Sequence, residues 1–167
     1  AVLSYLPRCH VAEQIFSVYF PLHLGLTVNF AEIIRTIQED LREIAPSVFL
    51  GVPRIWEKLQ ASIVVKIQET GPLRRWLFER ALAHGRRVAL RRLAREPVGL
   101  ADRVLGGVHH LLVKRALQNF VGLRRARHTF SAAAAISPEV LLFFRSAGIP
   151  VREGYGMTEC TGFSFVQ

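Results

Sequence analysis

The chain has 167 residues, half of them apolar and about a fifth charged, and its formal net charge is +9. This length and composition fit one globular domain and exclude a disordered chain. The cysteines, Cys9 and Cys160, are too few for a disulfide framework and have no partner at zinc spacing, which excludes a disulfide-rich or zinc-binding module. We therefore expect a reducing compartment, either the cytoplasm or the surface of a membrane. No apolar run approaches the roughly 18 residues of a membrane-spanning helix.

The first 51 residues alternate short β-branched or aromatic runs with longer helical patterns. These patterns predict strands at residues 2–6, 26–30 and 47–50 and helices at residues 11–24 and 31–44. The alternation is typical of βαβ units in an α/β fold with a mostly parallel sheet. Pro46 predicts the end of the second helix, because the residue before a proline disfavours the α conformation.

The middle of the chain reads as helices alone, at residues 53–71, 73–93 and 101–120. We interpret residues 53–120 as a helical insertion within the α/β domain. The first helix carries a broad apolar face that we expect to be buried, made of Ile55, Trp56, Leu59, Ile63, Val64 and Ile67. The second is expected to bury Trp76, Leu77, Leu82 and Val88 and to display arginines, namely Arg74, Arg75, Arg80, Arg86, Arg87, Arg91, Arg92 and Arg95.

The α/β pattern then resumes. A strand is predicted at residues 126–131, followed by a helix with Ser137 at its N-cap, Pro138 at its first position and Gly148 at its left-handed C-terminal cap. Residues 149–152 form the next predicted strand, and residues 163–167 are again strand-like. Residues 154–159 therefore follow the carboxyl end of a strand, which is where open α/β sheets bind ligands.

The stretch of residues 152–162 concentrates glycines with Tyr155, Thr158 and Glu159. Glycine lets backbone approach a ligand, while a hydroxyl and a carboxylate suit a phosphate and its magnesium ion. A tight strand-to-helix turn with a buried Tyr155 would give the same pattern. Elsewhere, His109 and His110 are adjacent, so on a helix they point about 100° apart and do not share a metal ion.

Several stretches, taken together and in order, resemble the adenylate-forming superfamily and, more narrowly, its long-chain fatty acyl-CoA synthetases. They are Leu-Pro-Arg-Cys-His-Val-Ala-Glu at residues 6–13, Val-Phe-Leu-Gly-Val-Pro-Arg-Ile-Trp-Glu-Lys at residues 48–58, residues 131–139, and Glu-Gly-Tyr-Gly-Met-Thr-Glu at residues 153–159. The resemblance spans nearly the whole chain and is least specific at residues 71–120. It implies part of the large N-terminal domain of an AMP-binding enzyme.

The resemblance implies a ligase that forms acyl-AMP and pyrophosphate from a fatty acid and ATP, and then acyl-CoA from coenzyme A. It implies that His10 packs near the reacting carboxylate, that Thr158 hydrogen-bonds the α-phosphate and that Glu159 ligates Mg²⁺. Tyr155 would stack beside the adenine, and Phe16 and Tyr19 would line the acyl tunnel. The nucleotide contacts implied are Ala133, Ala134, Glu153, Gly154, Tyr155, Gly156, Met157 and Thr158.

The sequence departs from the family pattern around residues 131–135. Ser-Ala-Ala-Ala-Ala stands where the family commonly has Ser-Gly-Ala-Ala-Pro. If the glycine position requires a positive φ, Ala132 costs on the order of 1 kcal/mol there, which would weaken nucleotide binding. Arg8 also replaces a residue that is usually small or apolar.

The family's phosphate loop, ribose-binding aspartate and adenylation lysine have no counterpart in these 167 residues. We therefore expect the chain to be the middle of a longer enzyme and to be inactive by itself. Two alternatives stay open, a degenerate homologue and a non-catalytic module whose arginine-rich helices bind an anionic membrane. Nucleic acid is not an expected partner, because those helices lack the interleaving of aromatic and basic residues that suits base stacking.

Overall fold

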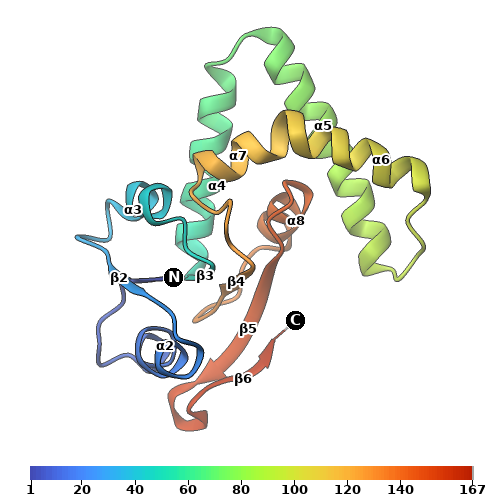
Figure 1. Ribbon diagram of the computed structural model, residues 1–167. Coiled ribbons are helices and arrows are strands. Elements are labelled where there is room, and N and C mark those ends of the chain that lie inside the picture. Colours follow the sequence, from blue (N-terminus) through green and yellow to red (C-terminus); the bar gives the residue numbers. More distant parts are fainter. Residues whose placement is uncertain (167) are drawn as a thin grey trace.

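The strands of the computed structural model, which describes residues 1–166, form a sheet in the order β2-β1-β3-β4-β5-β6 (Figure 1). Adjacent strands from β2 to β5 are parallel, and β6 is antiparallel to β5. This confirms the predicted α/β fold with a mostly parallel sheet. The strands are β1 (Val2–Ser4), β2 (Val28–Phe30), β3 (Val48–Gly51), β4 (His128–Ser131), β5 (Val151–Met157) and β6 (Gly162–Val166). Gln167, the last residue of the strand-like run predicted at residues 163–167, lies outside the described residues.

Helices connect these strands, and most begin where the sequence predicts. They are α1 (Val11–Gln14), π-helical η1 (Ile15–Tyr19), α2 (Phe20–Leu24), α3 (Ile37–Ile44), α4 (Pro53–Gln68), α5 (Pro72–Leu93), α6 (Leu100–His109), π-helical η2 (His110–Lys114), α7 (Arg115–Phe120), α8 (Pro138–Ser146) and 3₁₀-helical η3 (Thr158–Cys160). The caps of α8 are as predicted, because Ser137 accepts a hydrogen bond from Glu139 N and Gly148 has a φ of 83°.

Helices cover both faces of the sheet, because side chains alternate along each strand. Leu3 and Phe49 point to one face, in a core shared with α3, α4 and α8. Val2 and Leu50 point to the other, in a smaller core around Phe16 of η1. The doubly wound arrangement thus follows from strands that are apolar on both faces.

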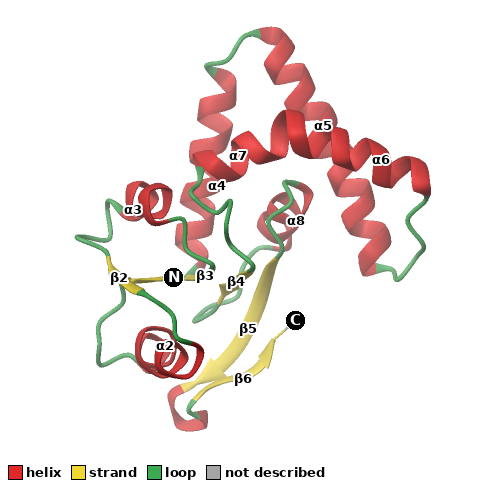
Figure 2. Ribbon diagram, in the orientation of Figure 1, coloured by secondary structure: helices red, strands yellow, loops and turns green. Residues whose placement is uncertain are grey.

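The helices α4 to α7 form an arm between β3 and β4 (Figure 1). Figure 2 shows this end of the molecule as helices and loops, while the strands gather at the other end. The helix α5 packs on α8 through Phe78, Ala81 and Gly85. The predicted buried face of α5 was wrong at Trp76, which is 52% exposed, while Leu77, Leu82 and Val88 are partly buried. In α4, Val64 is also exposed, while the rest of the predicted face is buried or partly buried.

Two predicted boundaries differ from the structure. The helix predicted at residues 31–44 begins only at Ile37, because Ala31 N donates to Ser4 O and keeps the chain extended beside β1. The strand predicted at residues 149–152 begins at Val151 and continues to Met157, because its second half pairs with β6. Among the helices of residues 1–166, none combines the length and the apolar character needed to cross a bilayer.

Candidate functional site

The strand order reverses between β1 and β3, because β2 lies on one side of β1 and the later strands lie on the other. Doubly wound sheets form a crevice for ligands at such a point. A cavity of about 240 Å³ lies there, at the carboxyl ends of β3, β4 and β5. It brings together five of the predicted site residues from three distant segments, namely His10, Ala133, Gly156, Met157 and Thr158. Its apolar wall includes Leu50, Val52 and Phe163, which sequence reasoning had not assigned to a site.

His10 is exposed at the start of α1. Its Nδ1 atom accepts a hydrogen bond of 3.2 Å from Ala12 N and caps the helix. Nδ1 is therefore the unprotonated nitrogen, and Nε2 is the atom that can donate to a ligand.

A buried carboxylate that sequence reasoning missed holds the loop beneath His10. Glu13 accepts hydrogen bonds from the hydroxyls of Ser4 and Ser17, and from Leu6 N at 3.1 Å. These contacts link the end of β1 to α1, so they determine where His10 stands. The signal was a glutamate at the third position of a helix, where a carboxylate commonly bonds to the preceding backbone.

Tyr5 joins the same loop to the neighbouring strand. Its hydroxyl donates a hydrogen bond of 2.8 Å to Leu50 O, at the carboxyl end of β3. Burial raises the pKa of Tyr5 well above its ordinary value, so the phenol keeps its proton and remains a donor. The floor of the cavity is thus built from hydrogen-bonded segments of β1 and β3.

The glycines of residues 154–156 are required by the pairing of β5 with β6. A side chain at Gly154 would collide with the ring of Phe163, and one at Gly156 would collide with Gly162 O. The alternative of a tight turn with a buried Tyr155 is wrong, because this segment is a strand and Tyr155 is 59% exposed. The ring of Tyr155 is therefore accessible to a planar ligand.

Thr158 and Glu159 form the short turn η3 between β5 and β6. Thr158 lines the cavity, whereas Glu159 is exposed beside it. Within residues 1–166, no group of three metal-ligating side chains occurs. Glu159 still fits Mg²⁺ chemistry, because protein-bound Mg²⁺ commonly uses one or two carboxylates and takes its remaining oxygens from water and phosphate.

Of the remaining predicted nucleotide contacts, Glu153 has a structural role. Its Oε1 atom accepts a hydrogen bond of 3.2 Å from Ile136 N, which ties the loop after β4 to β5. That loop carries Ala133 into the cavity wall, while Ala134 is exposed outside it. The structure therefore brings Ala133 and Thr158 to one cavity, whereas its lining does not include Ala134, Glu153, Gly154, Tyr155 and Glu159.

The strained position in this loop is Ala133, with a φ of 77°, rather than Ala132 as the family pattern had suggested. Ala133→Gly should raise the free energy of unfolding by about 0.5–1 kcal/mol, because relief of left-handed strain exceeds the entropy added to the unfolded chain. Ala134→Gly is the matched control and should lower it by a similar amount. Denaturant titration of both variants measures the change in the free energy of unfolding. A change of the same sign in both variants would contradict the assignment of strain to Ala133.

Comparisons with known proteins identify a family and several relatives. The family described as AMP-binding enzyme matches residues 1–167. Long-chain-fatty-acid--CoA ligase ACSBG2 of Rattus norvegicus is 34% identical over 165 residues, which cover 96% of this chain and 24% of that protein. The protein of the same name in Gallus gallus is 36% identical over 165 residues, which cover 96% of this chain and 21% of that protein. The chain thus spans about a quarter of the length of these relatives.

A solved structure shows the same fold. The adenylation domain of a carboxylate reductase from Mycobacterium chelonae superposes with a TM-score of 0.56 at 21% sequence identity, covering 99% of this chain and 21% of that one. The match extends over nearly all of the chain and shows a likeness of the overall fold. With a family match over its whole length and relatives that are fatty-acid ligases by name, this chain belongs to the AMP-binding enzymes.

Proposed function

We propose that this chain is part of the AMP-binding domain of a long-chain fatty acid:CoA ligase, with residues 53–120 as a helical insertion in that domain. In the proposed reaction a fatty carboxylate attacks the α-phosphate of ATP, which gives acyl-AMP and releases pyrophosphate. The thiol of coenzyme A then attacks the acyl carbon, and AMP leaves. The observation that carries the proposal is the cavity at the carboxyl ends of β3, β4 and β5, which both His10 and Thr158 line.

Each proposed role matches the exposure of its side chain. The hydroxyl of Thr158 lines the cavity and would donate to an α-phosphate oxygen. The exposed Glu159 would supply one carboxylate to Mg²⁺, which offsets phosphate charge when bound. The exposed ring of Tyr155 would stack on adenine. His10 would place its Nε2 atom near the reacting carboxylate, held there by its bond to Ala12 N.

The acyl group would enter beside η1. Phe16 is buried against Phe130 and Phe163, with ring centroids 5.8 Å away in both cases. It therefore packs behind Phe163, which lines the cavity, and does not line the cavity itself. Tyr19 is 59% exposed and lies on the outer side of the same helix, so we assign it no contact with the acyl chain.

The cavity has the size of one part of an active site. Its 240 Å³ fall below the range of about 300–1,000 Å³ of pockets that enclose a ligand of ordinary drug size. We therefore propose that residues 1–166 supply one wall for ATP and fatty acid. We expect the 167-residue chain by itself not to catalyse exchange of pyrophosphate into ATP.

The test is fatty-acid-dependent pyrophosphate exchange by the complete protein that carries this chain. Glu159→Ala should reduce the rate of exchange by about 10²–10³-fold, because it removes a carboxylate from the cation that stabilises the transferring phosphoryl group. Glu57→Ala is the matched control, since Glu57 is also exposed but lies on α4 in the arm. Unchanged exchange in Glu159→Ala would reject the assignment.

A second candidate function is peripheral binding to an anionic membrane from a cytoplasmic compartment. Along α6 and η2, apolar side chains recur at helical spacing on one exposed face, with Leu100, Val104 and Leu111 being 77%, 63% and 67% exposed. Exposed Arg103 and Arg115 lie along the same helical segment, and apolar and basic residues in combination are typical of helices that lie in a membrane interface. Arg87 and Arg91 are less available, because both are paired with Asp102.

Replacing Val104 and Leu111 by Gln should weaken binding to vesicles that contain phosphatidylserine by about tenfold, because both apolar side chains lose their insertion energy. The matched control replaces Val65 and Leu73, which are 55% and 69% exposed on α4 and α5. Co-sedimentation with the vesicles measures the binding. Equal loss in both variants would show a general surface effect and reject the assignment to α6.

A further inference from the structure

A second and larger cavity, of about 490 Å³, lies in the arm at the amino-terminal end of β5, opposite the turn η3. Its walls come from α5, α6, η2 and α8, and Gly148 and Pro150 of the loop before β5 close one side. No role proposed above uses this cavity. The segments that build it are distant in sequence, so only the fold brings them together.

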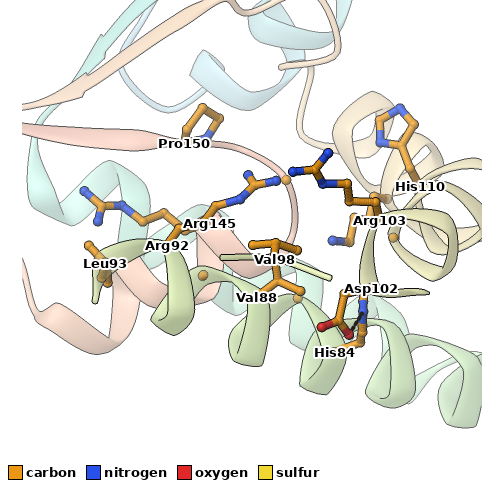
Figure 3. Close-up of a pocket in the computed structure, with 15 residues that line it drawn as sticks. His84, Val88, Arg92, Leu93, Val98, Asp102, Arg103, His110, Arg145 and Pro150 are labelled. Carbon is orange, nitrogen blue, oxygen red and sulfur yellow. Dashed lines mark ion pairs between the residues drawn. The ribbon is translucent and has the colours of Figure 1, made fainter. Parts of the chain in front are cut away.

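Cations from separate elements converge on this cavity. Arg103 comes from α6, Lys114 from η2 and Arg145 from α8, and Arg92 of α5 lines the outer edge. Figure 3 shows Arg103 and Arg145 extending toward each other from opposite sides of the cavity, above Val98. Two guanidinium groups that point at one another repel unless an anion lies between them.

The cations are held in place by the surrounding structure. Arg145 Nε donates to Val151 O at 3.3 Å, which directs its side chain along the start of β5. The aliphatic part of Lys114 passes beside Gly148, where an added Cβ would lie 3.4 Å from Lys114 Cδ. Burial first, and the charge of Arg92 second, lower the pKa of Lys114 below its ordinary value, as expected where positive charge is concentrated.

The carboxylate at the cavity does not neutralise these groups. Asp102 Oδ1 lies 3.0 Å from Arg87 Nη2 and 3.3 Å from His84 Nε2, on the side of the cavity nearest α5. Asp102 Oδ2 lies 2.8 Å from Arg91 Nη1. Partial burial raises the pKa of Asp102, but Arg87, His84 and Arg91 outweigh it and hold the pKa below its ordinary value. Among residues 1–166, no acidic side chain forms an ion pair with Arg103, Lys114 or Arg145.

We propose that this cavity is a binding site for a phosphate monoester, with Arg103, Lys114 and Arg145 as its ligands. Guanidinium groups bind phosphate oxygens in pairs, and an ammonium group adds a point charge. The apolar side chains of Val88 and Val98 line the space behind them and suit a small apolar group on the ligand. The site lies at the opposite end of β5 from the cavity that His10 and Thr158 line. This proposal does not depend on the function proposed above.

The experiment titrates the isotopically labelled protein with inorganic phosphate at constant ionic strength. Saturable shifts of the amide resonances of Gly106 and Gly148, which line the cavity, are expected at lower phosphate concentration than any shift at Gly156. Arg103→Gln with Arg145→Gln should raise the dissociation constant by at least tenfold, because two charge-assisted contacts are lost. Arg103→Gln with Lys114→Gln should have the same effect and leaves the bond from Arg145 to Val151 intact.

The matched control is Arg74→Gln with Arg124→Gln, which removes two exposed positive charges outside the cavity and should change the dissociation constant less than threefold. Equal weakening in the control, or no saturable shift at Gly106 and Gly148, would overturn the proposal.

Vesicles of phosphatidylcholine with phosphatidic acid separate the sources of the phosphate. Vesicle binding that depends on Arg103 and Arg145 indicates that the phosphate belongs to a lipid headgroup. Binding of inorganic phosphate without binding of vesicles indicates a soluble ligand.

Discussion

Trp56→Ala should lower the free energy of unfolding by about 3–5 kcal/mol, the range for removal of a large aromatic side chain from a core. Trp56 is fully buried on α4, and its ring lies 5.5 Å from Phe49 and 5.0 Å from Phe144, centroid to centroid. It therefore joins the sheet, α4 and α8 in one core. Its Nε1 atom donates to Gly51 O at 3.1 Å and to Phe130 O at 3.2 Å, so it also bridges the carboxyl ends of β3 and β4.

The chain offers a control of the same chemistry. Trp76→Ala removes the same side chain from α5, where it is 52% exposed and contacts the guanidinium of Arg80, 5.5 Å from the ring centroid. The expected loss there is about 1 kcal/mol or less. Denaturant unfolding followed by circular dichroism compares the two, and equal losses would contradict the central position of Trp56. Trp56→Phe should fall between them, because it keeps most of the packing and loses the donor.

Gly85→Ala should destabilise the arm by about 2 kcal/mol or more, although alanine normally stabilises a helix relative to glycine by about 1 kcal/mol. Gly85 lies in α5 where that helix crosses α8. An added Cβ would lie 2.9 Å from the carbonyl carbon and 3.0 Å from the Cα of Ser146, and would collide with its oxygen. These are backbone atoms, so the contact is relieved only if the two helices separate.

Gly107→Ala provides the opposite case. Gly107 is also helical, in α6, and no described atom lies within 4 Å of its added Cβ beyond its own neighbourhood. This substitution should therefore stabilise the protein by about 0.5–1 kcal/mol. The midpoints of thermal unfolding of both variants measure the effect. A shift of the same sign in both would show that helix propensity, and not the α5–α8 crossing, controls the stability of the arm.

Much of the fold was predictable from local signals. The alternation of strands and helices up to residue 51, and the caps Ser137 and Gly148, depend on neighbours in sequence, and the structure agrees with them. The start of α3 was not predictable, because the bond from Ala31 to Ser4 joins segments that the sequence does not show to be adjacent. The exposure of Trp76 on α5 was not predictable for a related reason, since both faces of this helix carry apolar residues and the crossing with α8 selects one.

Some residues of the candidate site were likewise predictable from the sequence, and others were not. The segment with Tyr155, Thr158 and Glu159 stands out in the sequence because glycine, hydroxyl and carboxylate residues cluster there. The support beneath His10 from Glu13, and the use of Glu153 to hold the loop after β4, were visible only once the contacts were known. The left-handed strain was expected at Ala132 and falls on Ala133, because the path of that loop is set by β4 and β5 rather than by its own composition.

For this protein, the sequence by itself determined the α/β class, the helical character of the arm and the presence of a glycine-rich segment with ligand-binding chemistry, because period, caps and residue type are local properties. The tertiary structure decided that residues 154–157 form a strand, that His10 and Thr158 share a cavity, and that Arg103, Lys114 and Arg145 converge. These features depend on strand order and helix crossing, and both are settled by packing between distant segments.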